Sequence, residues 1–356
     1  MNRRRATLGA AVIGVVAGAV GLGVLAAPAG AGQAPSLPAI SPQALVQSVL
    51  TAKPVALGGT VAVTNNLGLP AIPGLPTQLT SGSSQLRVWT DGSGHSRLSL
   101  PSSGAEQTYV DDGKTLYEWD SSNKTVTEHA LGAGKAGAHA GMPDNQTLTP
   151  AGAAQELVST IQDTSTVSVN GTDTVAGRPA YDLVLTPKPQ EKTLLREVTI
   201  SIDSQTRVPL QVSVLANGSA TPAVQVGFSS IDFGKQDPSL FTFTPPAGST
   251  VVHGDSANKR VNDGTAQVQP KFVGTGWDTV VLATLPAEMT NGSTNGSGDP
   301  DPMRLLNEFA TPISGSWGSG WAIGTSVGGA VITSDGRVAA GFVPQQVLIQ
   351  ALAGSK

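Results

Sequence analysis

The sequence contains no cysteine, and this absence excludes several kinds of protein. Disulfides, thiolate metal sites, a cysteine nucleophile and a lipid-modified N-terminal cysteine are all ruled out. Charged residues make up only 13% of the chain and the formal net charge is −4. Nucleic-acid binding needs clustered Lys and Arg to displace counterions from phosphates, so we expect no nucleic acid among the partners.

Aromatic residues are also scarce, at 4% of the chain. Any hydrophobic core must therefore consist mostly of Val, Leu, Ile and Ala. By contrast, the sequence holds 43 Gly and 25 Pro. Both residues punctuate turns, so this composition favours many short strands over long helices. The length of 356 residues allows two domains.

The N-terminus has the pattern of an export signal. Residues 3–5 are arginines, an apolar run of about 22 residues follows, and Ala29 and Ala31 form a small-residue cleavage site. The apolar run is also long enough to span a membrane. Residues 1–31 are therefore predicted to be a signal peptide or an uncleaved signal anchor. Either way we expect an exported protein of the cell envelope, secreted after cleavage near Ala31 or membrane-anchored.

Turn residues and apolar alternation predict the main elements. Short amphipathic helices are expected at residues 41–53 and 148–162, capped by Ser41 and Thr149. Hairpins are expected to turn at residues 91–94, 112–113 and 121–123. Five strands then follow, at residues 165–175, 180–187, 194–203, 208–216 and 223–233. Several of them alternate apolar and polar residues, which indicates a large antiparallel sheet with one apolar face.

An apolar, proline-containing loop interrupts this pattern at residues 67–83. Proline disfavours a central strand, so we expect a loop or an edge excursion. It either packs on the protein's own core or forms a flap over an apolar ligand site. The lid or flap candidates are Leu67, Leu69, Ile72 and Leu75.

A polar segment at residues 254–266 indicates a linker. Residues 267–356 are then expected to form a small α+β domain. Its predicted elements include a strand over 275–286, a short helix over 302–310, a hairpin that turns at Asp335-Gly336 and a terminal helix that begins at Pro344.

The search for catalytic chemistry finds no convincing set of residues. The four histidines do not form an i, i+4 pair, so no metal site is expected. Residues 324–328 match a nucleophile-elbow pattern, but another strand is predicted after them and no histidine follows His253. Acidic residues cluster in one stretch, where they are interpreted as turn residues and as the wet outer face of a hairpin: Asp111, Asp112, Glu118 and Asp120. We therefore expect no enzyme, no catalytic residue and no cofactor.

Residues 41–252 resemble a known superfamily. The segments that carry the resemblance read "YVDDGKTLYEWDSSNKTVTEH", "VAGRPAYDLVLTPK", "REVTISIDSQTRVPLQVSVL" and "VGFSSIDFGKQDPSLFTFTPPAGSTVV". These segments and their order along the chain resemble those of LolA/LolB-type lipoprotein carriers and of RseB/MucB-type sigma-factor regulators. The arrangement of leader, large domain and small C-terminal unit looks like that of the actinobacterial members.

The resemblance implies an α+β fold that is mostly antiparallel β. Residues 32–253 would form a half-open, unclosed β-barrel wrapped on helices, followed by the linker and the small C-terminal α+β domain. It also implies a non-catalytic carrier or chaperone that accommodates acyl chains of lipids or lipoproteins in an apolar cavity. The alternative is an extracytoplasmic sensor that binds a membrane anti-sigma factor, a transporter or another envelope protein.

Apolar strand residues would line such a cavity, although a structural core would use the same residues. The candidates are Val61, Val63, Leu86, Val88, Leu98, Leu100, Tyr117, Trp119, Tyr181, Leu183, Val198, Ile200, Leu210, Val212, Val226 and Phe228.

Overall fold

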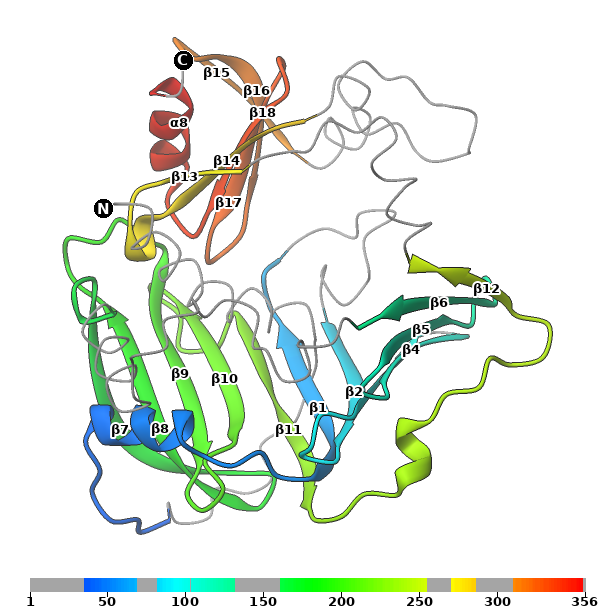
Figure 1. The fold of residues 1–356 in the computed structure, drawn as a ribbon. Helices are drawn as coiled ribbons and strands as arrows, with labels where there is room; N and C mark the ends of the chain where they lie inside the picture. Colours follow the sequence, from blue (N-terminus) through cyan, green and yellow to red (C-terminus); the bar gives the residue numbers. More distant parts are fainter. Residues whose placement is uncertain are drawn as a thin grey trace, which may run out of the picture.

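The computed structural model describes residues 35–68, 82–102, 104–131, 161–254, 270–285 and 310–354. Several predicted segments lie outside these ranges: the export signal, most of the apolar loop, nearly all of the second helix, the linker and the short helix at 302–310. Within the described ranges, no helix has both the length and the apolar character needed to cross a membrane. The strands form two sheets, one of 12 strands and one of six (Figure 1).

The larger sheet begins with the predicted hairpins and ends with the predicted series of strands. Its strands are β1 (Leu57–Asn65), β2 (Gly82–Thr90), β3 (Ser96–Ser102), β4 (Ala105–Asp111), β5 (Thr115–Asp120), β6 (Thr125–Ala130), β7 (Ser165–Val175), β8 (Arg178–Pro187), β9 (Leu195–Asp203), β10 (Pro209–Ala216), β11 (Val224–Phe233) and β12 (Thr250–His253). Their spatial order is β12-β6-β5-β4-β3-β2-β1-β11-β10-β9-β8-β7.

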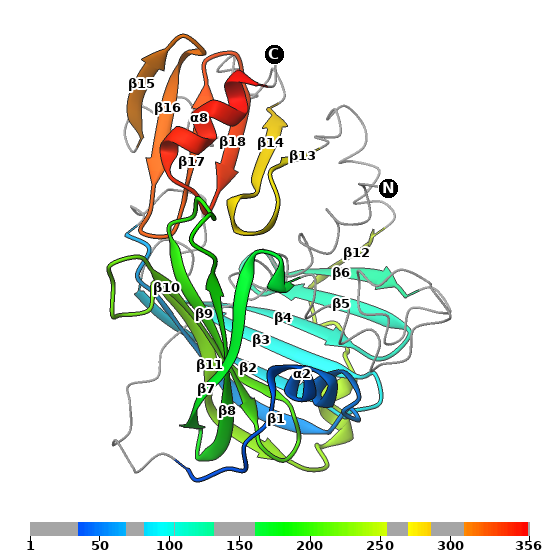
Figure 2. The same ribbon diagram turned by 90° about the vertical axis from the view of Figure 1, so that its left-hand side faces the viewer.

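This sheet is strongly curved but does not close (Figures 1 and 2). The strands at its two ends, β12 and β7, are not paired with each other. Every neighbouring pair is antiparallel except β12 with β6, which is parallel. The predicted half-open, mostly antiparallel barrel is therefore confirmed.

Two acidic residues of the β4–β6 region cap turns, Asp112 as predicted and Asp120 in addition. The carboxylate of Asp112 accepts hydrogen bonds from the backbone N–H groups of Lys114 (2.9 Å) and Thr115 (2.7 Å). Gly113 between them has φ +81°, a left-handed conformation that glycine adopts without steric cost. The carboxylate of Asp120 caps the next turn by accepting from the N–H of Ser122 at 2.8 Å.

Helix α2 (Pro42–Leu50) lies against one face of the larger sheet, which we call the inner face. Ser41 caps the helix, since its hydroxyl accepts a hydrogen bond from the N–H of Ala44 (3.2 Å). Leu45 is fully buried and packs in a cluster with Tyr181, Leu183 and other residues of β8 and β9. The hydrophobic contact with the sheet thus positions this short helix.

The chain after β11 wraps around the opposite, outer face of β2–β6. It contains the short helix η1 (Pro238–Phe241), capped by Asp237. Phe241 is buried, with its ring centroid 6.2 Å from that of His95. The ring of Phe243 lies 5.3 Å from that of Tyr117. This wrap keeps part of the outer face away from water.

The smaller sheet consists of β13 (Lys271–Val273), β14 (Val280–Thr284), β15 (Thr311–Gly315), β16 (Gly318–Gly324), β17 (Gly329–Thr333) and β18 (Arg337–Gly341). The short helix η2 (Gly276–Asp278) precedes β14, and helix α8 (Gln345–Ala353) follows β18. The sheet is wholly antiparallel, in the order β13-β14-β18-β17-β16-β15. Its helix α8 packs Leu348 and Leu352, each 1% exposed, into the core. The predicted hairpin at Asp335-Gly336 joins β17 to β18, and β16 is a separate strand before it.

The smaller sheet contacts one end of the larger sheet (Figure 1). The carbonyl of Phe342 accepts hydrogen bonds from the N–H of Leu194 (2.9 Å) and the hydroxyl of Thr193 (2.7 Å). The indole N–H of Trp277 donates to the hydroxyl of Ser165 at 2.7 Å. Val327 and Phe342 also pack with Val63, Val198, Val214 and other apolar residues of the larger sheet. The smaller sheet therefore covers that end of the inner face.

Candidate functional site

An apolar row crosses the inner face over five adjacent strands. Leu183 of β8 pairs with Ile200 of β9, and Ile200 pairs with Val212 of β10. Val212 pairs with Val226 of β11, which pairs with Val63 of β1. The register thus places these side chains side by side, although they come from parts of the chain far apart in sequence.

The row continues onto β2 and β3, because Val61 pairs with Leu86 and Val88 pairs with Leu98. Most of the predicted lining residues therefore share one face. The predicted residues on the inner face are Val61, Val63, Leu86, Val88, Leu98, Leu100, Tyr181, Leu183, Val198, Ile200, Val212, Val226 and Phe228.

The inner face is covered only in part. Helix α2 covers the portion on β8 and β9, and the smaller sheet covers the end near Val198 and Val214. Ile200 is partly buried and packs against the hydrophobic clusters under both covers. Between these covers, several apolar side chains remain only half-buried: Val88, Leu98, Leu100, Ile200, Val212, Val226 and Phe228. An apolar strip bordered by packed elements is a common form of ligand site.

Tyr117 and Trp119 do not belong to this strip, so the prediction that they line it is wrong. They pair with Val110 and Thr108 on the outer face. Tyr109 lies on the inner face instead, because it pairs with Leu98. Period-2 alternation shows which residues share a face, but it does not show which face is inner.

Glu118 also lies on the inner face, because it pairs with Tyr109. Asp120 lies on the same face, because it pairs with Gln107, two residues before Tyr109. The prediction that Glu118 and Asp120 lie on the solvated outer face is therefore wrong. The hydroxyl of Tyr109 donates a hydrogen bond to Glu118 at 3.2 Å. Burial raises the pKa of Tyr109, and the adjacent Glu118 carboxylate raises it further. Together these two residues form a polar patch at the end of the apolar strip.

Leu210 has a structural role. It is 1% exposed and packs with Val175 and Ala180 in a separate cluster, against which the partly buried Phe228 also packs. The register between β9 and β10 shifts at this residue, so Leu210 lies at an irregularity of the strand. Among the flap candidates, Leu67 is half-buried against the cluster that contacts the smaller sheet. The other three, Leu69, Ile72 and Leu75, lie outside the described residues.

A fully buried carboxylate, that of Asp203, lies at the end of β9, beside the turn to β10. The sequence alone gave it no role. Asp203 accepts hydrogen bonds from the Nε (2.8 Å) and Nη2 (3.1 Å) of Arg178. It also accepts from the backbone N–H groups of Gln205 (3.0 Å) and Thr206 (2.6 Å). Burial tends to raise the pKa of Asp203, but these hydrogen bonds outweigh burial and lower it. The Asp of the "ISIDSQT" segment therefore holds this turn.

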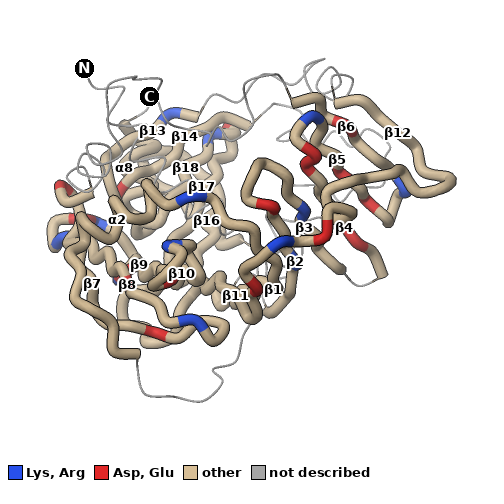
Figure 3. Tube along the Cα trace, turned by 60° about the horizontal axis from the view of Figure 1, so that its bottom comes forward, with Lys and Arg blue, Asp and Glu red and all other residues tan. Residues whose placement is uncertain are grey.

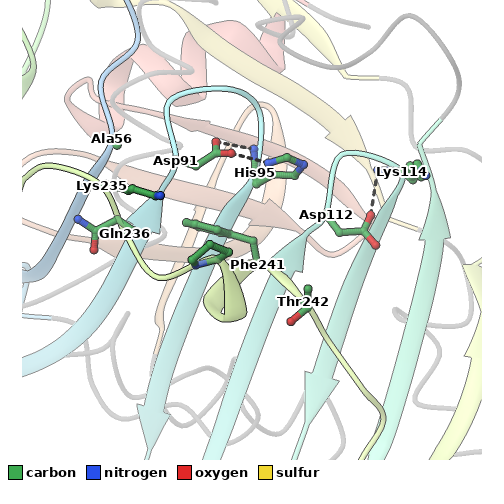
Figure 4. Close-up of a pocket in the computed structure, with 10 residues that line it drawn as sticks. Ala56, Asp91, His95, Asp112, Lys114, Lys235, Gln236, Phe241 and Thr242 are labelled. Atoms are coloured by element: carbon green, nitrogen blue, oxygen red, sulfur yellow. Dashed lines mark hydrogen bonds and ion pairs between the residues drawn. The ribbon is translucent and has the colours of Figure 1, made fainter.

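A cleft of about 560 Å³ lies elsewhere, beside η1 (Figure 4). It is lined by Ala56, which precedes β1, by the β2–β3 and β4–β5 turns, and by the chain after β11. His95 contacts the carboxylate of Asp91 through Nδ1, and this hydrogen bond raises the pKa of His95. Burial tends to raise the pKa of Asp91, but hydrogen bonds from Ser93 and His95 lower it overall. Sequence reading could not find this cleft, because its walls come from four separate segments.

The residues that suggested catalysis have structural positions. Gly324 ends β16 and Gly329 begins β17, so the nucleophile-elbow match is a turn between two strands. The N–H of Thr325 donates to the carbonyl of Gly328 (2.7 Å) across this turn. Among the described residues, no group of three or more His, Asp or Glu is arranged to hold a metal ion. Lys and Arg are interspersed with Asp and Glu along the chain rather than gathered on one element (Figure 3).

No protein-family model matches the chain, and no curated protein sequence does. Solved structures similar to it include the Pseudomonas aeruginosa MucA/MucB complex, with 16% identity, 86% of this chain and 94% of that chain covered, and a TM-score of 0.44. A structure of MucB is 14% identical, with 87% of this chain and 95% of that chain covered and a TM-score of 0.41. A LolA superfamily protein from Nitrosomonas europaea is 12% identical, with 58% of this chain and 99% of that chain covered and a TM-score of 0.24. Both groups that the sequence resemblance names are thus among the similar structures.

Proposed function

We propose that this protein is a non-catalytic binding protein of the cell envelope that holds acyl chains of lipids or lipoproteins against the inner face. The observation that carries the proposal is the apolar row from Leu183 through Ile200, Val212 and Val226 to Val63. This row lies on an open sheet, and several of its side chains are only half-buried.

The physical driving force is burial of apolar surface. Each methylene taken out of water contributes about 0.8 kcal/mol, so about 12 methylenes would contribute roughly 10 kcal/mol. Lost translational freedom and side-chain ordering subtract several kcal/mol from this gain. Aliphatic side chains with few polar groups suit such a ligand, because they leave no polar atom unsatisfied beside the chain.

The test is to purify the exported protein natively, extract it and identify bound lipid by mass spectrometry. Binding of a fatty acid is then compared between Ile200→Asp and Thr199→Asp. These neighbours on β9 point to opposite faces, so Thr199→Asp is a matched control for folding. We expect at least a tenfold loss of affinity for Ile200→Asp and less than a twofold change for Thr199→Asp. Equal effects of the two variants, or no lipid binding at all, would contradict the proposal.

Docking of an envelope protein, such as a membrane anti-sigma factor, is the second candidate function. The observation that favours it is the edge strand β13, whose Phe272 is 47% exposed. An exposed edge strand can pair with an extended segment of another chain. Crosslinking in membranes should then lose a defined partner in Phe272→Asp and keep it in Lys271→Asp. Retention of the partner in both variants would exclude β13 as the docking strand.

A further inference from the structure

A cationic side chain lies at the edge of the inner face. Arg207 follows the turn that Asp203 holds, and its guanidinium carbon is 5.4 Å from the centroid of the Tyr181 ring. Tyr181 is 6% exposed and stands beside Leu183 on the inner face of β8. Its hydroxyl donates to the carbonyl of Pro38 at 3.0 Å, so the ring is held in place under the guanidinium.

No acceptor in the described structure uses the donors of Arg207. Its Nη1 is shielded from water and has no hydrogen-bond partner. The five ion pairs among the described residues do not include it. The Arg207 side chain is only partly buried, and no described residue accepts a hydrogen bond from its Nε or Nη2. A guanidinium fork with free donors matches the geometry of a carboxylate or phosphate.

Two neighbouring arginines each have an acceptor for part of the guanidinium group, although the Nε of Arg196 is also shielded without a partner. Arg178 donates twice to Asp203, and the Nη1 of Arg196 donates to the carbonyl of Ser219 at 2.6 Å. Asp203, four residues before Arg207, is therefore already occupied by Arg178. The backbone of Arg207 is fixed, because its N–H donates to the carbonyl of Asp203 at 3.2 Å. The turn thus presents a charged side chain that no residue of the described ranges neutralises.

We propose that Arg207 anchors the anionic headgroup of an acyl ligand, with the chain lying along the apolar row. This inference rests on the proposed function and names the ligand class: an amphiphile with a carboxylate or phosphate next to its chain. From the edge at Tyr181, the chain would run over the half-buried side chains of Ile200, Val212 and Val226, beside the part of the face that α2 covers. These residues cross three strand spacings, which is about 14 Å.

The test compares charged and neutral ligands that share one chain. Oleate and methyl oleate are titrated calorimetrically into the wild type, Arg207→Asn and Lys124→Asn. Arg207 has φ +65°, and Asn tolerates this conformation well, so Arg207→Asn should fold. Lys124 is a matched control: it is an exposed cation with φ +53° in the β5–β6 turn.

We expect Arg207→Asn to lose about tenfold or more in affinity for oleate and less than twofold for methyl oleate. Lys124→Asn should change neither affinity by more than twofold, and Arg207→Lys should restore part of the preference for oleate. A parallel pair, dioleoyl phosphatidate and dioleoylglycerol, shows whether a phosphate is preferred to a carboxylate. Unfolding temperatures confirm that each variant is folded.

Two results would overturn the anchor. The first is an unchanged oleate affinity in Arg207→Asn, and the second is an equal loss for oleate and methyl oleate. Failure of the wild type to bind any of the four ligands would instead remove the proposed function, and the anchor with it. The two failures are therefore distinguishable in one set of titrations.

Discussion

Replacing Asp203 by alanine removes the acceptor on which the β9–β10 turn and the Arg178 guanidinium both depend. The Asp203 side chain is 0% exposed and that of Arg178 is 27% exposed. Removal of one partner of a buried pair typically costs about 3–5 kcal/mol, since the remaining charge keeps its desolvation penalty without compensation. Asp203→Ala also leaves the N–H groups of Gln205 and Thr206 without their acceptor. We therefore expect a loss of about 3–5 kcal/mol in the free energy of unfolding.

Asp203→Asn separates the charge from the turn. Its amide oxygen can still accept from the backbone, so we expect a smaller loss, about 1.5–3 kcal/mol. Urea unfolding followed by far-UV circular dichroism measures both variants. A double-mutant cycle with Arg178→Ala then gives the interaction free energy of the Asp203–Arg178 pair, separate from the contribution of the turn. A loss below about 1 kcal/mol for Asp203→Ala would refute the reasoning, because a buried and fully bonded carboxylate cannot be that dispensable.

The pH dependence has a definite sign. Hydrogen bonds lower the pKa of folded Asp203 below its ordinary value of 3.8, despite the opposing effect of burial. A carboxylate with a lowered folded pKa stabilises the fold fully above its unfolded pKa, and this contribution is lost as the pH falls through the folded pKa. The stability difference between wild type and Asp203→Asn should therefore be constant near neutrality and shrink below pH 3.8. A difference that grows on acidification would contradict this assignment.

Two further predictions concern the helix on the inner face and a hairpin turn. Leu45→Ala should lower the free energy of unfolding by about 2–5 kcal/mol, because the Leu45 side chain is fully buried between α2 and the sheet. Hydrogen exchange should show that the amides of α2 lose protection first, and unchanged protection of these amides would argue against the packing described. Gly113→Val should destabilise the β4–β5 hairpin, because φ is +81° and a Cβ at this position would come within 3.1 Å of the His95 Nε2. The unfolding temperature of Gly113→Val should therefore fall. The control is Lys114→Val, at the next residue, which is exposed; it should leave the unfolding temperature nearly unchanged.

The sequence by itself determined the local elements of this protein. Asp112-Gly113 set a hairpin, Ser41-Pro42 started a helix, and the alternation through Val198, Ile200 and Ile202 marked a strand with one apolar face. These signals depend on residues within a few positions of one another, so they can be read without knowing the rest of the fold. The resemblance to LolA-like and RseB/MucB-type proteins added the open barrel.

Only the tertiary structure decided which face is inner and what covers each face. Tyr117 and Trp119 have the composition of a cavity wall, yet the wrap after β11 covers their side of the sheet, with Phe243 against Tyr117. The parallel pairing of β12 with β6 and the contact of Trp277 with Ser165 likewise join segments more than 100 residues apart. Arg207 stands over Tyr181 only because the β9–β10 turn brings it there. Such contacts depend on the path of the whole chain, and a short-range pattern carries no information about that path.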